Sequence, residues 1–137
     1  MRRLGKRAAV LLLPLTLAAC FGSDGGRSIP DDRAGLQPFP ANYRSEAVAA
    51  MRSYLNNPVG VREAAIAEPV LRTVGGRPFY VACLRYAAPE SDGSYRGPRE
   101  RAIVYVNGRL DRVIERSSEL CAGAVYAPFP ELEKMTR

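Results

Sequence analysis

The stretch RAIVYVNGRLDRVIE, Arg101–Glu115, carries the strongest local structure signal in the chain. Two runs of strand-forming residues flank the dipeptide Asn107-Gly108. Both dipeptide residues tolerate positive φ, which a two-residue type I′ turn requires at its two central positions. The stretch therefore predicts a β-hairpin in which Val106 pairs with Arg109, and hence an antiparallel sheet.

Upstream of this hairpin, apolar residues also follow the two-residue period of β-strands. A strand is predicted over 78–87, and we expect it to be central because both of its faces are mostly apolar. Another strand is predicted over 64–74, where Pro69 indicates an edge or a bulge. Gly75-Gly76 predicts the turn between them, and 89–98 is a polar loop.

A helical period precedes the strands. The helix is predicted to begin near Asn42, a good N-cap residue, and to end at Asn56-Asn57-Pro58. Its apolar residues recur at steps of three and four and form one stripe, Tyr43, Ala47, Val48, Met51, Tyr54 and Leu55. The stripe could lie in a membrane interface, but few basic residues accompany it, so we favour packing in the core.

The order of these elements predicts an α+β domain over 41–137: one amphipathic helix packed on a small antiparallel sheet of about four strands. The tail over 121–135 reads as extended and broken by prolines. Its apolar residues are available to cover the sheet: Ala124, Val125, Tyr126, Phe129 and Leu132.

The first nineteen residues read as a secretory signal peptide. Four positive charges precede an apolar run of twelve residues, Ala8 to Ala19, which as a helix is about 18 Å long and too short for a hydrocarbon core of about 30 Å. Without this signal, 118 residues remain, with 16 basic residues against 14 acidic ones. No basic run or helix-turn-helix pattern remains, so we expect no nucleic-acid partner.

The signal ends in Leu17-Ala18-Ala19-Cys20, which resembles the lipobox of bacterial lipoproteins. This resemblance implies cleavage between Ala19 and Cys20 and a lipid anchor on Cys20. An ordinary secretory signal, with Cys20 free or paired, is the alternative. Phe21 rather than aspartate follows Cys20, which by the sorting rule of enteric bacteria favours the outer membrane. The resemblance thus implies a cell-envelope protein that faces the periplasm.

Residues 20–40 read as a flexible tether behind that anchor. They are rich in glycine, proline and aspartate, and such a composition buries too little apolar surface to order itself. As a coil of about twenty residues it would average about 25 Å from end to end. We therefore expect the domain to be lifted off the lipid surface.

The odd cysteine count agrees with lipidation. If lipid consumes Cys20, then Cys83 and Cys121 are the two cysteines that remain. An oxidising periplasm lets two thiols pair and persist. Cys83 lies in the predicted central strand and Cys121 begins the tail, so a disulfide would fasten the tail to the sheet. Two buried, unpaired cysteines are the alternative.

Catalytic signals are weak. The chain has no histidine, which removes the commonest general base, the Ser-His and Cys-His dyads and most zinc sites. It also lacks a Cys-x-x-Cys pair and a phosphate-binding loop. We therefore expect no enzymatic activity, no cofactor and no metal.

Tyrosines and arginines are the candidate interaction residues. Tyrosine offers a large amphipathic contact area and is favoured at interfaces. The candidates on or near the sheet are Tyr80, Tyr86, Tyr95, Tyr105 and Tyr126. Arg96, Arg99 and Arg101 flank a Gly-Pro turn and could clasp an anionic headgroup or glycan. The alternatives are tyrosines half-buried at sheet edges and arginines that serve solubility or pair with Glu100.

Three longer stretches resemble small, uncharacterised lipoproteins of alphaproteobacteria. They are NYRSEAVAAMRSYLNNPVGVREAAIAEP from Asn42, RPFYVACLRY from Arg77 and CAGAVYAPFPELEKM from Cys121. This resemblance implies no particular activity. The order of tether, helix and sheet is also similar, on architecture alone, to the small lipoprotein subunit of the outer-membrane β-barrel assembly machine.

Two functions follow from these observations as expectations. The first is a membrane-anchored, non-enzymatic binding or envelope-assembly module that meets an envelope protein. The second is a small periplasmic enzyme or ligand-binding domain that acts on a cell-wall or lipid component. A flat aromatic patch would favour the first, and a deep pocket with convergent Glu and Arg side chains would favour the second.

Overall fold

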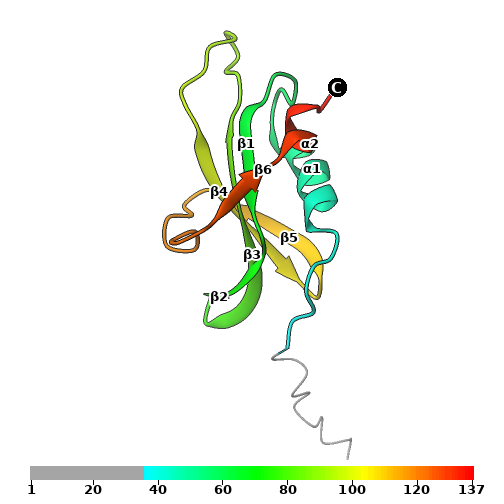
Figure 1. The fold of residues 1–137 in the computed structure, drawn as a ribbon, viewed down its shortest axis with the longest axis vertical. Helices are drawn as coiled ribbons and strands as arrows, with labels where there is room; N and C mark the ends of the chain where they lie inside the picture. Colours follow the sequence, from blue (N-terminus) through cyan, green and yellow to red (C-terminus); the bar gives the residue numbers. More distant parts are fainter. Residues whose placement is uncertain (1–35) are drawn as a thin grey trace, which may run out of the picture.

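A computed structural model describes residues 36–137 as an α+β fold built on one antiparallel sheet (Figure 1). The predicted signal peptide, Cys20 and most of the predicted tether lie outside the described residues. The strands are β1 (Arg62–Ala67), β2 (Val70–Val74), β3 (Arg77–Ala87), β4 (Arg99–Val106), β5 (Arg109–Ile114) and β6 (Tyr126–Pro128), and the helices are α1 (Tyr43–Tyr54) and α2 (Pro130–Glu133). The class is as predicted, with six strands and two helices where about four strands and one helix were expected. Within residues 36–137, neither helix is long and apolar enough to cross a membrane.

β3 is the central strand, as predicted. The sheet order is β5-β4-β3-β1-β6, and β2 pairs with the half of β3 that β1 leaves free. The strand predicted over 64–74 is thus two strands, interrupted at Glu68-Pro69. Proline has no N–H to donate to a strand ladder, so a continuous strand would lack one hydrogen bond at Pro69. The interruption falls at this position.

Both predicted turns are present. Asn107-Gly108 has φ values of 52° and 76°, and Val106 pairs with Arg109 as predicted. Gly75-Gly76, with φ values of 58° and 78°, joins β2 to β3. Because β3 and β4 run antiparallel, these two turns lie at the same end of the molecule (Figure 1).

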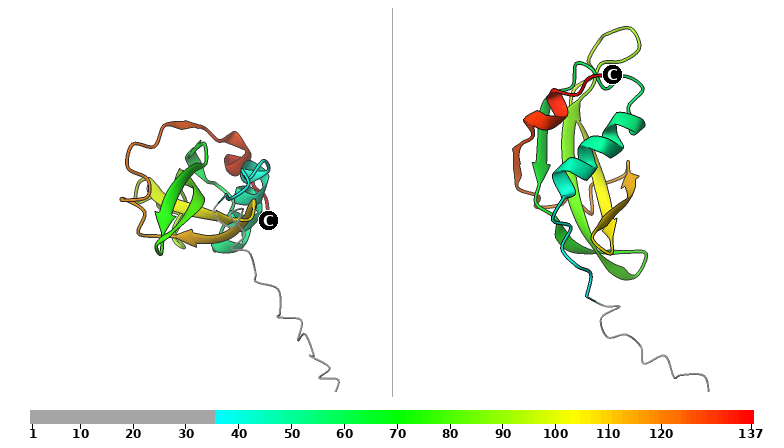
Figure 2. Two further views of the ribbon diagram at one scale, coloured as in Figure 1. Left: turned by 90° about the horizontal axis from the view of Figure 1, so that it is seen from below. Right: turned by 90° about the vertical axis from the view of Figure 1, so that its right-hand side faces the viewer.

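α1 packs across one face of the sheet through its predicted stripe (Figure 2). Ala47 and Met51 are fully buried, and the rest of the stripe is partly buried against the same core. This favours core packing over the membrane-interface alternative. Asn42 stands at the N-cap position, but its side chain makes no capping hydrogen bond, so the expected capping role is not observed.

The other face of the sheet is covered by the segment that follows β5. Cys121 in this segment forms the predicted disulfide with Cys83 of β3, with Cα atoms 5.7 Å apart. The bond lies in a second apolar cluster that includes Val81 and Val104. The disulfide therefore fastens an irregular segment to the central strand.

The tail is more ordered than predicted. Instead of staying irregular it forms β6, which pairs with β1, and α2, which lies beside α1 (Figure 2). Phe129 and Leu132 are fully buried on the α1 face, as expected of residues that cover the sheet. Val125, predicted to cover the sheet as well, is 84% exposed instead.

Residues 37–40, predicted to belong to the tether, pack against the domain. The side-chain Oε1 of Gln37 accepts a hydrogen bond from the backbone N–H of Asn107 at 2.7 Å. Phe39 packs edge-on against Tyr80, with ring centroids 5.3 Å apart, and Pro40 is buried. The predicted domain boundary at residue 41 therefore falls inside a segment that already contacts the sheet.

Candidate functional site

A cleft of about 550 Å³ lies at the end of the molecule opposite the two turns. It is termed the polar cleft here, and its charged and hydrogen-bonding lining includes Tyr54, Asn57, Tyr86, Glu90, Ser91, Arg99, Arg101, Glu115 and Arg137. These residues are distant in sequence. They converge because the end of α1, the end of β3, the start of β4 and the end of β5 meet at this end of the sheet.

Two arginines enter the polar cleft from one strand. Arg99 and Arg101 are two positions apart on β4, so their side chains share the face that α1 covers and stand about 7 Å apart along the strand. The sequence predicted that arginines of this region could clasp an anion. The structure brings these two into the cleft, whereas Arg96 does not line it and has a side chain that is 77% exposed.

A short chain of hydrogen bonds joins three of the lining residues. Tyr54 donates through its hydroxyl to Oε1 of Glu115 at 2.5 Å and accepts from Nε of Arg101 at 3.2 Å. Nη1 of Arg101 donates to the backbone oxygen of Glu100 at 2.9 Å. Among the described residues, Nη2 of Arg101 makes no hydrogen bond of ordinary geometry, although the hydroxyl of Tyr86 lies near the same guanidinium. One donor group of Arg101 is therefore directed at the cleft.

The pKa values of these groups are shifted further from neutral pH, downwards for the carboxyl group and upwards for the phenols. The hydrogen bond from Tyr54, with the nearby charge of Arg101, lowers the pKa of Glu115. Burial, with the hydrogen bond to Glu115, raises the pKa of Tyr54, and burial likewise raises the pKa of Tyr86. At neutral pH the cleft therefore holds an ionised carboxylate beside neutral phenols.

A second carboxylate balances the other arginine. Arg99 forms an ion pair with Glu90, which lies in the loop after β3. Each β4 arginine of the cleft thus has a carboxylate within its network: Arg99 pairs with Glu90 directly, and Arg101 is connected to Glu115 through Tyr54. The cleft carries both signs of charge, with the side chains of Arg99, Arg101 and Arg137 against those of Glu90 and Glu115.

Two of the tyrosines predicted to interact with a partner are core residues. Tyr86 is 1% exposed and Tyr105 is fully buried. The hydroxyl of Tyr105 donates to the backbone oxygen of Tyr43 at 2.9 Å, which joins β4 to the start of α1. Burial raises the pKa of Tyr105. Tyr105 is therefore a core residue and not part of an interaction surface, which corrects the expectation for it, whereas the largely buried Tyr86 still lines the polar cleft.

The other predicted tyrosines are scattered. Tyr95 lies in the loop between β3 and β4, where its hydroxyl donates to the backbone oxygen of Gly60 at 2.6 Å and the guanidinium of Arg62 lies 4.2 Å above its ring. Tyr80 packs edge-on against Phe39 at the opposite end. The structure therefore contains no single tyrosine face within residues 36–137.

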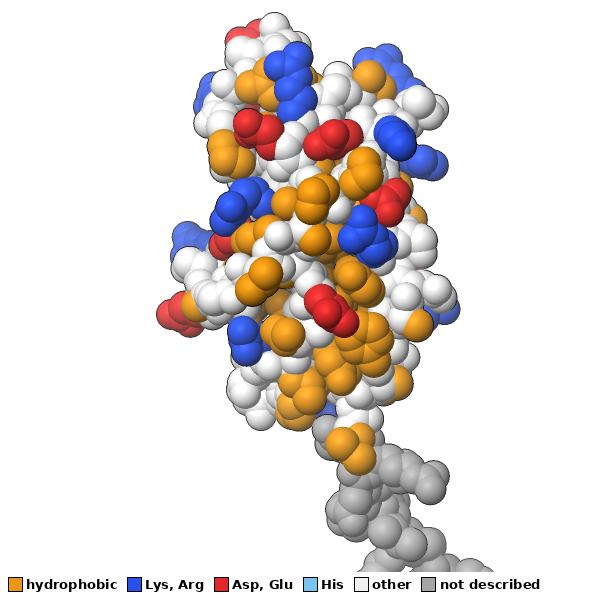
Figure 3. All heavy atoms as spheres, viewed as in Figure 1, with side chains coloured by type: hydrophobic (Ala, Val, Ile, Leu, Met, Phe, Trp, Pro, Cys, Tyr) orange, Lys and Arg blue, Asp and Glu red, His pale blue; other side chains and the backbone are white. Residues whose placement is uncertain are grey.

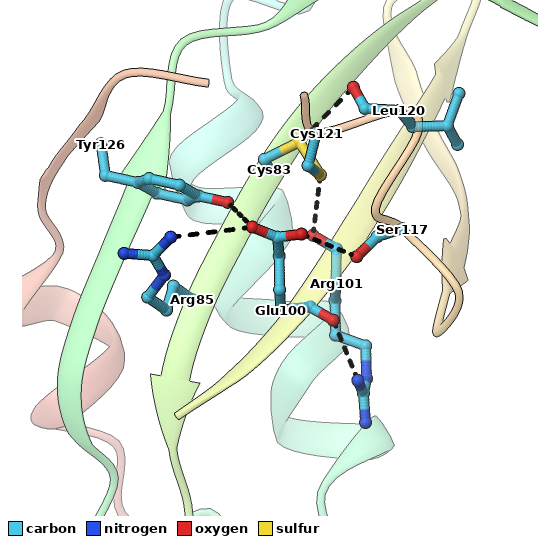
Figure 4. A network of polar contacts seen from close by, with 8 residues as sticks. All are labelled: Cys83, Arg85, Glu100, Arg101, Ser117, Leu120, Cys121 and Tyr126. Carbon is cyan, nitrogen blue, oxygen red and sulfur yellow. Dashed lines mark hydrogen bonds and ion pairs between the residues drawn. A yellow bond between two sulfur atoms is a disulfide. The ribbon is translucent and has the colours of Figure 1, made fainter. Parts of the chain in front are cut away.

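A second polar network lies on the other face of β4 (Figure 4). Glu100 accepts hydrogen bonds from the hydroxyls of Tyr126 at 2.6 Å and Ser117 at 3.3 Å, and its carboxylate lies 3.8 Å from Arg85. Burial and the hydrogen bond to Glu100 raise the pKa of Tyr126. The disulfide runs alongside (Figure 4). Because these groups pair with one another, the network fastens the segment after β5 to the sheet.

A smaller apolar pocket of about 240 Å³ lies beside the disulfide, between β2 and residues 120–125. Its apolar lining is Ala67, Val70, Val81, Cys83, Leu120, Ala124 and Val125. Val70 and Val125 at this pocket are 44% and 84% exposed. It is a second place where a ligand or partner could contact the molecule.

Sequence reasoning missed Tyr54, Glu115 and Glu90 as cleft residues. Tyr54 was assigned to the apolar stripe of the helix, where its ring does pack, and the two glutamates stand at a strand end and in a loop. No local spacing links the three. Within residues 36–137, no group of three or more Cys, Asp or Glu side chains is placed to hold a metal ion.

Comparison of the chain with protein-family models, with curated proteins and with solved structures gives no match. The polar cleft is therefore interpreted from its own geometry.

Proposed function

We propose that this protein is a lipid-anchored binding module of the bacterial envelope that takes a polar ligand into the polar cleft without catalysing a reaction. The observation that carries the proposal is the convergence of arginine, glutamate and tyrosine side chains from four separate parts of the chain in one cleft. A cleft of about 550 Å³ is within the range typical of small-ligand sites, about 300–1,000 Å³.

The envelope location rests on the sequence. The signal, the lipobox ending in Cys20 and the residue Phe21 support an anchor in the outer membrane, with the domain facing the periplasm. The pairing of Cys83 with Cys121 supports an exported domain, because disulfides persist in oxidising compartments and are rare in the cytosol. The membrane is thus the proposed first partner, reached through the lipid.

The charges of the cleft support a ligand that carries both a carboxylate and an amine. The Nη2 of Arg101 suits a carboxylate, since a guanidinium binds carboxylates through directed hydrogen bonds. The ionised carboxylate of Glu115 suits an ammonium group. Short cell-wall peptides carry both groups, so we propose this chemical class of ligand.

The pKa values support binding rather than catalysis. A general acid or base works best with a pKa near the working pH. In the cleft the pKa of Glu115 is lowered and that of Tyr54 is raised, so both groups hold their protonation states around neutral pH. The chain also has no histidine to take over proton transfer.

An envelope protein is a second candidate partner, favoured by the apolar pocket rather than by the tyrosines. Val125 and Val70, both at that pocket, are exposed apolar side chains on the face away from α1. A photo-crosslinking residue at Val125, compared with one at Val59 beyond the end of α1, tests this contact in cells. A protein captured at position 125 and absent at 59 supports it, and identical capture at both positions contradicts it.

Nuclear magnetic resonance tests the proposed ligand. A soluble cell-wall peptide with a free carboxylate and a free amine is titrated into the ¹⁵N-labelled protein. We expect saturable shifts at Arg99, Arg101 and Glu115, and no shifts around Cys121 beyond the noise. Shifts that gather at the apolar pocket, or that do not saturate, would contradict binding in the polar cleft.

A further inference from the structure

We infer that the end of the domain where residues 36–40 join the sheet is a lipid-facing surface that rests on an anionic membrane. This inference depends on the proposed lipid anchor, because it takes the membrane that holds Cys20 as the occupant of the surface. It adds an orientation of the domain that the anchor alone does not give, and it replaces the expectation that the tether lifts the domain off the lipid surface.

Exposed apolar side chains gather at this end. Leu36, Phe39 and Leu71 are 76%, 44% and 48% exposed. Phe39 and Leu71 form one patch because Phe39 packs on Tyr80, with ring centroids 5.3 Å apart, and Tyr80 is the cross-strand neighbour of Leu71. Leu36 lies three positions before Phe39 in the chain. Figure 3 shows hydrophobic side chains collected at the end of the molecule where the described residues begin. Contiguous exposed apolar side chains are typical of interaction sites.

The patch is held on a firm support. The backbone N–H of Asn107 donates to Gln37, and Pro38 lies against Gly108 of the same turn. Pro40, one residue after Phe39, is buried. These contacts fix Phe39 relative to β3, so a surface that rests on it would orient the whole sheet.

The position of the patch along the chain, close to the proposed anchor at Cys20, favours lipid as the partner of this surface. Sixteen positions separate Leu36 from Cys20, and a chain of that length spans at most about 55 Å even when fully extended. Phe39 of the patch follows Leu36 by three positions. The patch is therefore the part of the described domain that the anchor holds nearest to the membrane along the chain.

The chemistry of the patch fits a membrane surface. Leucine, phenylalanine and tyrosine are the side chains of interfacial anchors, where an apolar body meets a polar boundary. Arg77 at the β2–β3 turn is exposed, lies 5.6 Å over the ring of Phe79 on the face of β3 opposite to Tyr80, and forms no ion pair within residues 36–137. It supplies a positive charge for anionic headgroups at the same end of the sheet as the patch. Arg109 at the other turn is also exposed, although it pairs with Glu46.

This contact would set the direction of the polar cleft. The two turns lie at the patch end of the sheet and the cleft lies at the opposite end. A domain that rests on the patch therefore presents the cleft away from the membrane, towards the layer that contains cell-wall peptides.

The absence of tryptophan from the chain allows a direct test with single-tryptophan variants. Leu71→Trp places the probe in the patch, and Val59→Trp is the matched control, since Val59 is 42% exposed near the other end. Each full-length, lipidated variant is inserted into vesicles of phosphatidylethanolamine and phosphatidylglycerol, with or without bromine on the acyl chains. We expect brominated lipid to quench the tryptophan at 71 at least twofold more than that at 59. Adding Phe39→Ser to Leu71→Trp should reduce the quenching.

Equal quenching at the two positions would overturn the lipid-facing surface. Concentration-dependent self-crosslinking at 71 without quenching would overturn it too, because it would assign the patch to a second copy of the chain. The intact mass of each variant reports the anchor separately. A mass without diacylglycerol on Cys20 would overturn the proposed anchor and this inference together, whereas a lipidated protein with equal quenching would overturn this inference alone.

Discussion

Glu100 and Arg101 are consecutive residues of β4, yet their side chains belong to separate polar networks on opposite faces of the sheet. The guanidinium of Arg101 donates to Tyr54 in the polar cleft, and the carboxylate of Glu100 accepts from Tyr126 beside the disulfide (Figure 4). The alternation of side chains along a strand produces this separation. The sheet thus divides a network that fastens the chain from one that is available for binding, and each can be altered by itself.

Removing Glu100 from the fastening network should weaken the fold and spare the cleft. Glu100→Gln loses the charge that strengthens the hydrogen bonds from Tyr126 and Ser117, so we expect a loss of about 1–2 kcal/mol in the free energy of unfolding. Urea denaturation measures this loss. Ligand affinity should stay within twofold of the wild type, and a tenfold fall would show that the two networks are not separate.

The disulfide should contribute a large share of stability. Cys83 and Cys121 are 38 positions apart, for which the loop-entropy relation gives about 4 kcal/mol. The double variant Cys83→Ala/Cys121→Ala should therefore unfold at much lower urea concentration than the wild type. The wild type unfolded under reducing conditions is the control and should behave similarly. A difference below about 1 kcal/mol between oxidised and reduced wild type would contradict the expected contribution.

The hairpin turn should depend on glycine at its second position. Gly108 has a φ of 76°, where a β-branched residue is strained, so Gly108→Val should cost about 1–2 kcal/mol of unfolding free energy. Thermal and urea denaturation test this. Asn107→Gly is the control: its φ of 52° suits glycine, and stability should change little. An unchanged melting temperature for Gly108→Val would argue against the type I′ turn.

The hydrogen bond in the cleft should be visible in the titration of Glu115. Tyr54 lowers the pKa of this carboxyl, so Tyr54→Phe should raise that pKa towards the ordinary value of about 4.3. The pKa of Glu115 is lower in the folded protein than in the unfolded chain, where it is about 4.3. The hydrogen bond from Tyr54 therefore stabilises the folded protein above about pH 4.3, and this stabilisation is lost as the pH falls through the folded pKa. Nuclear magnetic resonance shifts of the Glu115 carboxyl carbon, followed from pH 2 to 7, measure this pKa in the wild type and in Tyr54→Phe.

Glu131 provides the internal reference for this titration. Its pKa is lowered by a hydrogen bond from Arg44, a contact between the two helices that does not involve the cleft. It should titrate identically in the wild type and in Tyr54→Phe. A pKa of Glu115 that does not move while Tyr54 is absent would show that the hydroxyl is not its main partner.

Local sequence patterns predicted the parts of the fold that depend on residues close together in the chain. Asn107-Gly108 specifies its own turn, and the stripe through Ala47 and Met51 specifies the buried face of α1. The two C-terminal elements, β6 and α2, were not predicted because they are too short to show the hydrophobic periodicity of a strand or a helix. β6 has three residues and α2 has four, and each is held by tertiary contacts, such as the pairing of β6 with β1. The break at Pro69 was predicted only as an edge or bulge.

The cleft could be predicted only in part. The arginines of β4 stand out in sequence because they are close together and alternate with other residues. Tyr54 and Glu115 gain their roles from the packing of α1 on β5, which no spacing in the chain reveals. The number of tyrosines in the sequence does not show which of them the fold buries. Tyr105 lies in the core, and Tyr86 is largely buried at the wall of the polar cleft.

The affinity of the polar cleft for a free carboxylate is the central claim. Isothermal titration calorimetry compares a cell-wall peptide bearing a free carboxylate and amine with the same peptide amidated at the carboxylate. Each is titrated into the wild type, Arg101→Gln and the control Arg112→Gln, whose arginine pairs with Asp111 on β5 and does not line the cleft. We predict that amidation weakens binding about tenfold or more in the wild type and in Arg112→Gln. In Arg101→Gln it should weaken binding about twofold or less, because this variant has already lost the charged hydrogen bond between Arg101 and the carboxylate, which contributes about 1.5–3 kcal/mol. Equal effects of amidation in all three proteins, or no binding of the free acid to the wild type, would contradict the account.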